Sequence, residues 1–256
     1  MSNYIRILGS GSSLGSPWIT GHWGFLKKKN NKNIRTRCSA YIQYKNLSIL
    51  IDTSPDIKKQ FLDNKIKNLD AVLFTHEHAD QTSGIFELRP YLWKNQNKMK
   101  MYGSERTMKT LKKNYDYIFK AKQGYLPIAT SHIIKSKVSI KKGNTKINFK
   151  CFEAQHGEIT STAYVFNKVA YISDCKNVDR KHYKYLDKLN LLIIDCLKFK
   201  SHPGHFSFEE SIEFAKKINA KKTVLTNLHV DLDYNFLLKN TPKNFYPAYD
   251  GMKLSF

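Results

Sequence analysis

Several features that would place a chain in a class at once are missing from this sequence. Its 256 residues contain no run of 18 apolar residues, so nothing in it predicts a membrane-spanning helix. No apolar signal core follows the N-terminal methionine, and we expect a cytoplasmic protein. No proline-rich linker or internal repeat divides the chain. The length suits one large domain or two small ones, and we expect a single domain over residues 1–256.

Paired cysteines are also missing. The chain has four cysteines at wide, irregular intervals and no CxxC pair, which argues against a zinc ribbon or a redox motif. We expect reduced, mostly buried thiols. Acidic residues are scarce too: 21 Asp and Glu face 43 Lys and Arg, which gives a net charge of +22.

The positive charge normally raises the hypothesis of a nucleic-acid-binding protein. Lys and Asn recur throughout this chain, however, as in residues 27–32, and a compositional bias would produce the same pattern. We therefore interpret the charge mainly as bias, although it would still attract phosphate-bearing substrates. Nucleic acid remains an open alternative as a partner, but a small substrate is favoured.

A glycine-rich loop at residues 9–17 matches neither of two common phosphate-binding fingerprints. Its glycines are spaced one residue too widely for a dinucleotide-binding turn, and it lacks the Gly-Lys-Ser/Thr end of a Walker loop. We interpret the loop as a tight turn whose hydroxyls are available to a substrate. The candidate substrate-binding residues are Ser10, Ser12 and Ser13.

Short β-rich runs dominate both halves of the chain. Strands are predicted at residues 4–8, 40–44, 48–52, 71–74, 138–140, 146–152, 162–166, 169–172, 191–194 and 223–226. Helical spacing appears at 57–64 and 208–218, and the region between the strands at 71–74 and 138–140 reads as helical. This order favours an α/β fold with two sheets and helices outside them.

The strongest motif is His76-Glu77-His78-Ala79-Asp80-Gln81, which directly follows the apolar run at 71–74. A loop at the end of a buried strand places these side chains in one small space. Neutral imidazole suits zinc, iron, manganese or nickel, and a carboxylate adds charge for a second ion. A solvated polar loop is the alternative, but two His and one Asp within five positions favour a metal site.

This motif resembles the His-x-His-x-Asp-His signature of the metallo-β-lactamase-fold hydrolases. Within that superfamily the chain looks most like the PhnP-like phosphodiesterases and, more distantly, ribonuclease Z. The resemblance covers nearly the whole chain and implies a four-layer αββα sandwich. Besides the metal loop, it rests on residues 9–17, 37–40, 51–55, 84–89, 155–157, 172–174 and 225–229.

The resemblance implies a site for two divalent ions, either zinc or manganese. The first ion would be held by His76, His78 and His156, the second by Asp80, Gln81 and His229, and Asp174 would bridge them. Gln81 stands where the family has His. An amide oxygen is a weaker ligand for zinc than imidazole, so the second position is expected to be weaker, manganese-selective or empty. Asp52 resembles a buried family carboxylate that orients a metal ligand or its loop.

The activity that the resemblance implies is hydrolysis of a small or cyclic phosphodiester by a metal-bridging hydroxide. Asp80 would act through the metal. His205 lies just before the helix predicted at 208–218 and would protonate the leaving oxygen, which suits a side chain with a pKa near 6.5. We expect His202 in a surface loop. His22, His132 and His182 have no partners in the sequence.

Three alternatives stay open. A ribonuclease Z-like endonuclease would process the 3′ ends of transfer RNA, but we see no long Gly- and Pro-rich arm for gripping RNA. A lactonase or thioesterase could use the same metal site. A nucleic-acid-binding module with a decayed site would explain Gln81 and the charge. A homodimer is also open, and the structural zinc loop of many PhnP-like proteins is not expected, because residues 18–37 contain no Cys.

Overall fold

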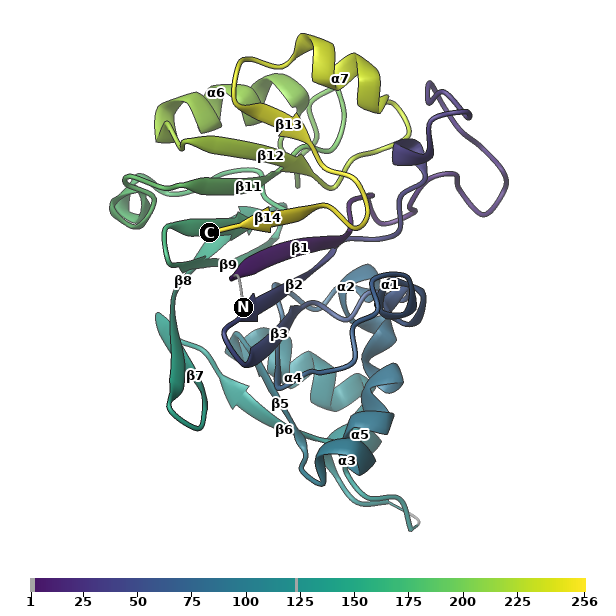
Figure 1. Cartoon of the computed structure of the whole chain (residues 1–256), viewed down its shortest axis with the longest axis vertical. Coiled ribbons are helices and arrows are strands. Elements are labelled where there is room, and N and C mark those ends of the chain that lie inside the picture. Colours follow the sequence, from purple (N-terminus) through teal and green to yellow (C-terminus); the bar gives the residue numbers. More distant parts are fainter. Residues whose placement is uncertain (1–2, 123) are drawn as a thin grey trace.

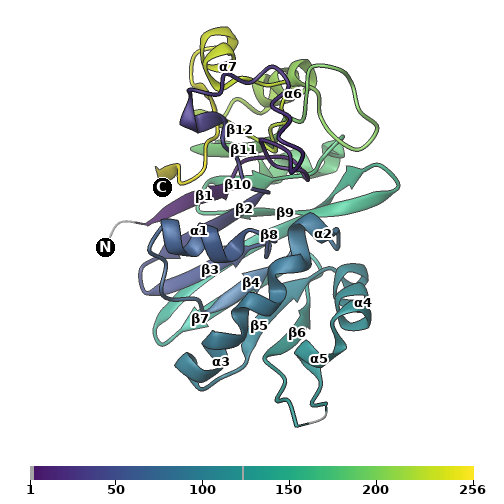
Figure 2. The ribbon, with the colours of Figure 1, turned by 90° about the vertical axis from the view of Figure 1, so that its right-hand side faces the viewer.

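Two sheets of seven strands pack face to face in the computed structural model, which describes residues 3–122 and 124–256 (Figure 1). Helices cover the outer face of each sheet, as Figures 1 and 2 show from two sides. The α/β class and the four-layer arrangement expected from the sequence are confirmed. Among the described residues, no helix is long and apolar enough to cross a membrane.

The first sheet has the order β14-β1-β2-β3-β4-β5-β6. Its strands are β1 (Tyr4–Gly9), β2 (Ser39–Tyr44), β3 (Leu47–Ile51), β4 (Ala71–Leu73), β5 (Met99–Gly103), β6 (Ala129–Ile133) and β14 (Lys253–Ser255). Strands β14, β1, β2 and β3 pair antiparallel, and β3 to β6 pair parallel. The helices of this half are α1 (Ile57–Asp63), α2 (Ala79–Thr82), α3 (Arg89–Asn95), α4 (Glu105–Asn114) and α5 (Asp116–Phe119).

The second sheet has the order β13-β12-β11-β10-β9-β8-β7. Its strands are β7 (Lys137–Lys142), β8 (Thr145–His156), β9 (Ile159–Phe166), β10 (Val169–Ile172), β11 (Leu191–Asp195), β12 (Lys222–Thr226) and β13 (Phe245–Pro247). Strands β7 to β10 pair antiparallel, and β10 to β13 pair parallel. Helices α6 (Phe208–Ile218) and α7 (Tyr234–Asn240) belong to this half, and 3-10 turns lie at Asn31–Asn33, Ser83–Leu88 and Arg180–Tyr185.

Burial on both faces explains why the central strands are continuous apolar runs. In β11, Ile193 packs between the two sheets, whereas its neighbour Ile194 packs outward beneath α6. In β3, Ile49 faces the inter-sheet core and Leu50 faces the cluster that contains residues of α1 and α4. Strands covered on both sides carry no alternating polar face, which is why these segments were recognisable as short apolar runs.

The structure differs from the sequence-based expectation in the middle of the chain. The region interpreted as helical contains α2 to α5 but also the strands β5 and β6. Both strands are five residues long, and in β6 only the first residue, Ala129, is buried. Lys100, Ser131 and His132 interrupt the apolar pattern, so parallel pairing of β5 with β4 and of β6 with β5 decides their conformation instead of local preference.

The carboxyl ends of the central strands meet along one edge of the sandwich. There, three residues that directly follow or lie just beyond strands take a left-handed backbone: Asp52 (φ 62°), Asp174 (φ 52°) and Asn227 (φ 64°). Asp and Asn are the non-glycine residues that adopt this conformation most readily. The chain therefore turns sharply at this edge, and polar side chains from β3, β4, β8, β10, β11 and β12 come together there.

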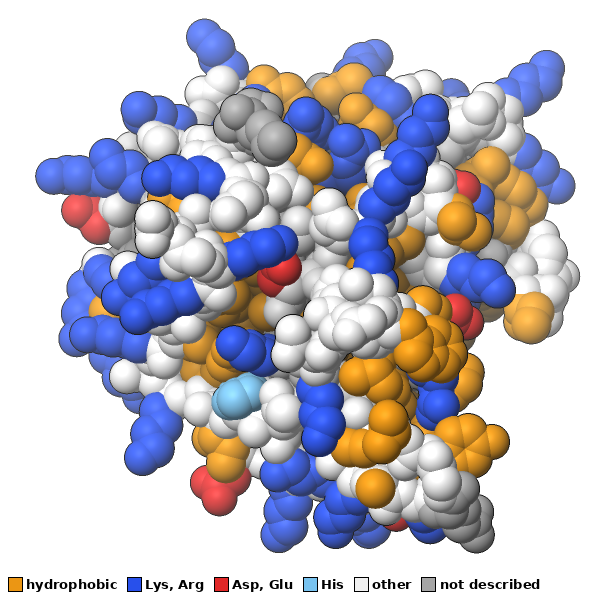
Figure 3. All heavy atoms as spheres, turned by 60° about the horizontal axis from the view of Figure 1, so that its bottom comes forward, with side chains coloured by type: hydrophobic (Ala, Val, Ile, Leu, Met, Phe, Trp, Pro, Cys, Tyr) orange, Lys and Arg blue, Asp and Glu red, His pale blue; other side chains and the backbone are white. Residues whose placement is uncertain are grey.

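On the face of the molecule shown in Figure 3, Lys and Arg are not gathered into one stripe. On the face in Figure 3, basic side chains are scattered among neutral and apolar ones, with only a few acidic side chains between them. A nucleic-acid interface would concentrate basic groups along one groove or face. The face in Figure 3 shows no such concentration, and the interpretation of the net charge as a compositional bias stays a prediction.

The carboxylate of Asp250 ties the first loop to the C-terminal segment. One oxygen accepts hydrogen bonds from the amide and hydroxyl of Ser10, at 2.9 and 2.8 Å, and the other from the amide and hydroxyl of Thr36, at 2.7 and 2.6 Å. Burial raises the pKa of Asp250, and these four donors oppose that rise. The long loop between β1 and β2 therefore depends on a residue near the C-terminus.

We predict that Asp250→Ala destabilises the protein by about 2–4 kcal/mol, because it leaves buried amide donors without partners. Urea unfolding monitored by circular dichroism would measure the change. Asp187→Ala removes an exposed carboxylate and serves as the control, with an expected change within about 0.5 kcal/mol. Equal midpoints for both variants would show that the Asp250 cluster does not stabilise the loop.

Candidate metal centre and active site

Three imidazoles from two elements converge at the edge where the strands end. His76 and His78 lie in the loop between β4 and α2, and His156 is the last residue of β8. Their potential ligand nitrogens all lie within 4.8 Å of one another, and their ring centroids are 4.5 to 5.1 Å apart. The loop and the strand belong to different sheets, so the packing of the two sheets brings this donor set together.

Hydrogen bonds fix which nitrogen of two rings faces the centre. The Thr75 hydroxyl donates to Asp52 at 2.8 Å, so its oxygen accepts from Nδ1 of His76 at 3.0 Å. His76 Nε2 is buried without a hydrogen-bond partner. In the same way, Nδ1 of His156 donates to the carbonyl of Gly204 at 2.6 Å, which leaves Nε2 facing His78 Nδ1 at 3.3 Å.

The environment favours the neutral form of His76 and His78. Burial lowers the pKa of His76 well below its usual value, and the neighbouring His156 and His78 lower it further. Burial and His156 also lower the pKa of His78. Neutral rings with a directed lone pair, oriented by a partner on the other nitrogen, are the usual zinc ligands. The partnerless His76 Nε2 and this donor set fit a divalent ion held by three imidazoles.

Asp52 is buried beside the loop that contains His76. It has no exposed surface and accepts hydrogen bonds from both the amide and the hydroxyl of Thr75, each at 2.8 Å. Burial raises the pKa of Asp52, and the two Thr75 hydrogen bonds oppose that rise. Its contact with the metal loop is thus made through Thr75, the residue that holds the ring of His76.

Two carboxylates lie beside the three imidazoles and share one amide. Gln81 Nε2 donates to Asp80 at 3.2 Å and to Asp174 at 3.3 Å. Burial and the nearby Asp174 raise the pKa of Asp80 to about 6, against the hydrogen bond from Gln81. Asp174 also accepts a hydrogen bond from Ser173 at 2.6 Å. The amide oxygen of Gln81, which would be its metal ligand, has no partner.

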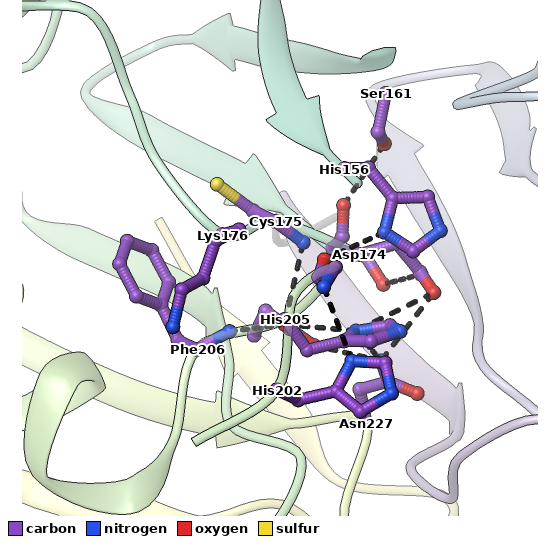
Figure 4. A network of polar contacts seen from close by, with 12 residues as sticks. His156, Ser161, Asp174, Cys175, Lys176, His202, His205, Phe206 and Asn227 are labelled. Atoms are coloured by element: carbon purple, nitrogen blue, oxygen red, sulfur yellow. Dashed lines mark hydrogen bonds and ion pairs between the residues drawn. The ribbon is translucent and has the colours of Figure 1, made fainter. Parts of the chain in front are cut away.

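His205 faces the same centre from the opposite side and has a carboxylate partner. Its Nδ1 lies 3.0 Å from Asp195, the last residue of β11, and Figure 4 shows its ring beside Asp174 and Asn227. The Asn227 amide donates to Asp195 at 2.7 Å and to Asp174 at 3.4 Å. Burial opposes protonation of His205, but Asp195, Asp174 and Asp80 raise its pKa to about 9.

These side chains line a hollow of about 360 Å³. Its lining residues are Ser12, Ser13, Leu14, His78, Asp80, His156, Asp174, Leu197, Lys198, His202, His205, Asn227 and His229. His202 lies in a partly exposed loop between β11 and α6, as expected, and that loop borders the hollow. His229 borders the hollow, but its ring is placed beside Trp18, with centroids 5.6 Å apart, and beside Asp231.

The assignment of Ser10 as a substrate-binding residue is corrected by the structure. Its hydroxyl donates to Asp250, and it does not line the hollow. Ser12 and Ser13 do line it, and the Ser12 hydroxyl is buried without a partner. The structure thus places His76, His78, Asp80, Gln81, His156, Asp174 and His205 around one centre, with His229 at its border. Their roles as ligands or catalysts stay predictions.

Sequence reasoning missed Asp195, Asn227 and Thr75. Asp195 is the last residue of the buried strand Leu191–Asp195. A carboxylate at the end of a buried strand could have indicated a site residue. Asn227 lies two residues before the predicted ligand His229, within the segment used for the resemblance. Thr75 directly precedes His76, and only the position of Asp52 reveals its role.

Comparisons with known proteins agree with this geometry. The model of the family described as beta-lactamase superfamily domain matches residues 48–227. The crystal structure of a diphosphatase from the PhnP family is 30% identical, with a TM-score of 0.89 over 100% of this chain and 98% of that chain. Zn²⁺-bound PqqB from Methylobacterium extorquens is 16% identical, with a TM-score of 0.76 over 99% and 100% of the two chains.

Two further similarities bear on the alternatives. The short form of human tRNase Z is 17% identical, with a TM-score of 0.69 over 98% of each chain, a likeness that concerns the fold alone. An octanoyltransferase of Porphyromonas gingivalis is 28% identical over 251 residues, which are 96% of this chain. The chain spans about half the length of that curated relative.

We predict that Thr75→Val lowers the affinity for the metal ion about 10- to 100-fold, because it removes the hydroxyl that joins Asp52 to His76. Val has nearly the shape of Thr, so the fold should be retained. Competition with a chromogenic chelator would measure the affinity. Thr75→Ser keeps a hydroxyl and should behave like the wild type, and a normal affinity in Thr75→Val would refute the role of this hydrogen-bond chain.

Proposed function

The chain belongs to the beta-lactamase superfamily and is a metallo-β-lactamase-fold hydrolase, and on this basis we propose that it is a metal-dependent phosphodiesterase acting on a small phosphodiester. The proposal rests on one observation: the same hollow contains histidines in two different electrostatic environments. Neutral imidazoles suited to a metal ion lie on one side, and on the other lies His205, whose pKa is raised to about 9 beside Asp195.

The expected ion is zinc or manganese, held by His76, His78 and His156. When bound, it would supply a nucleophile from water at neutral pH and would neutralise charge on a phosphoryl oxygen. The chain's own groups do the rest. Asp195 holds the ring of His205 toward the hollow and stabilises its protonated form, and His205 gives that proton to the leaving oxygen.

The other polar groups that line the hollow favour a phosphate ester over a carbonyl compound as the substrate. Lys198 and the hydroxyls of Ser12 and Ser13 border the hollow and can donate to phosphoryl oxygens. An alkoxide leaving group needs a proton, and a permanently oriented acid supplies it. The hollow of about 360 Å³ suits a small ligand. The similarity to a PhnP-family diphosphatase, at 30% identity over the whole chain, supports phosphorus chemistry as well.

Acyl transfer through a cysteine is not supported by the site. All four cysteines are buried and none lines the hollow. Burial raises the pKa of Cys151 and Cys196 to about 12 and those of the other two well above the usual value, so none is an activated thiol. The name of the octanoyltransferase belongs to a protein about twice as long, of which this chain matches half.

We predict that His205→Ala lowers kcat on an alkyl phosphodiester by about 10²- to 10⁴-fold, because the leaving alkoxide loses its proton donor. On bis(p-nitrophenyl) phosphate the loss should be much smaller, since p-nitrophenolate departs without a proton. Steady-state kinetics on both substrates, with metal content measured in parallel, would check this.

His182→Ala is the matched control, because His182 stacks on Phe152 and does not line the hollow. Equal losses on the two substrates in His205→Ala would mean that His205 positions the phosphate. Loss of the metal ion in that variant would make His205 a ligand, and either result would remove its role as the acid.

We also predict weak binding of nucleic acid, because Lys and Asn recur throughout the chain and the basic side chains on the face shown in Figure 3 are spread out. Any binding of transfer RNA should be weaker than micromolar at physiological salt. Filter binding across a salt series would measure it, and each single-strand phosphate contacted would add a slope of about −0.7 log units of affinity per log unit of salt. Sub-micromolar binding with a steep slope would favour the ribonuclease Z-like alternative.

A further inference from the structure

We infer that Gln81 takes the place of a second metal ion, so that the protein binds one ion tightly. The amide of this side chain cross-links Asp80 and Asp174, the two carboxylates that would otherwise hold the second ion. The inference rests on the metal dependence in the proposed function and concerns the number of ions the site accepts. Three observations carry it: the direction of the Gln81 amide, the hydrogen bonds of Asp174, and the location of the remaining donors.

The Gln81 amide nitrogen lies between the two carboxylates. It is 3.2 Å from Asp80 Oδ2 and 3.3 Å from Asp174 Oδ2, and Gln81 has no exposed surface. The opposite orientation would turn the amide oxygen toward two carboxylates, where it would be repelled. Two N–H groups directed at carboxylates form charge-assisted hydrogen bonds, which are among the stronger ones. A second ion would have to break both and rotate the amide.

Asp174 has little capacity left for a second ion. Its Oδ2 accepts hydrogen bonds from Ser173 at 2.6 Å and from Gln81, which uses both lone pairs of that oxygen. Its Oδ1 receives only the longer hydrogen bond from Asn227, at 3.4 Å, and remains available to the ion held by the three imidazoles. The carboxylate that would bridge two ions is therefore arranged for one.

The remaining donors do not complete a second set. Among the described residues, two groups of three His, Cys, Asp or Glu donors converge within 4.8 Å, and neither contains Asp80 or His229. One group is the three imidazoles. The other is His156, Asp174 and His205, but His156 has already used Nδ1 on Gly204 and offers only Nε2. One nitrogen lone pair cannot bind two ions. This group therefore shares His156 with the three-imidazole position and does not form a second metal position.

The amide performs part of the electrostatic role of a cation. Two carboxylates side by side disfavour each other's charged form, and Asp174 is itself buried. The partial positive charges of the Gln81 N–H groups offset this repulsion without an ion. An imidazole in this position would instead present a lone pair to an ion between the carboxylates. The residue at position 81 therefore determines whether this half of the centre is closed by a hydrogen bond or by a metal.

Metal stoichiometry tests the inference without any substrate. The wild-type protein, Gln81→His and Gln81→Met would be loaded with excess Zn²⁺ or Mn²⁺, dialysed, and assayed by inductively coupled plasma mass spectrometry. We expect about one ion per chain in the wild type and about two in Gln81→His, because His restores a nitrogen ligand. Gln81→Met removes the amide without adding a nitrogen and should stay near one.

Titration of the metal-free wild type with Co²⁺ gives an independent measurement if Gln81→His fails to fold. Absorption in the visible range should saturate at one equivalent, with no second tight phase. Two tightly held ions in the wild type, or a folded Gln81→His that still holds one, would overturn the inference and leave the proposed function intact. A wild type that retains no ion would instead overturn the metal dependence on which both depend.

Discussion

Burial of ionisable groups at the junction of the two sheets is the constraint on which the rest of the site depends. His76, Asp52 and Asp195 have no exposed surface, so each needs a partner or must give up its charge. The outcome differs with the partner. His76 has a hydroxyl on one nitrogen, and its pKa is lowered; His205 has a carboxylate, and its pKa is raised to about 9.

This divergence assigns the two kinds of histidine to different chemistry. Titratable groups in one site whose surroundings push their pKa values apart serve distinct roles. A neutral ring with a free lone pair can hold a metal ion, whereas a protonated ring held by Asp195 can give up a proton. Two of the carboxylates beside these histidines, Asp52 and Asp174, take a left-handed backbone at the edge of the sandwich.

The sequence predicted those parts of the site that local pattern determines. The metal loop follows a buried strand directly, and His156 and Asp174 also lie at or just after strand ends, so their convergence was foreseeable. The links that order them were not. Asp195 contacts His205, which lies ten positions further along the chain. Ser10 was assigned to the substrate from its place in the glycine-rich loop, and its true partner, Asp250, lies 240 positions away.

In the fold, too, features set by local sequence pattern were predictable and contacts between distant segments were not. The strands buried on both faces were recognisable from short apolar runs, and β10 and α6 were predicted with the bounds that the structure has. The strands β5 and β6 were not recognised, because charged and polar residues break their pattern and parallel pairing to a neighbour decides their conformation. Sequence patterns thus report burial well but report pairing between distant segments poorly.

The charge of the hollow is opposite to that of the molecule as a whole. A chain with a net charge of +22 places Asp80 and Asp174 in the lining of one small cavity and Asp195 behind His205, which also lines it. An anionic phosphodiester would be repelled from three carboxylates if they were unpaired. Hydrogen bonds from Gln81 and Asn227 and the cationic form of His205 offset part of that charge. A divalent ion on the three imidazoles would add the positive charge that holds a phosphoryl oxygen there, so the acidity of the hollow is itself an argument for metal dependence.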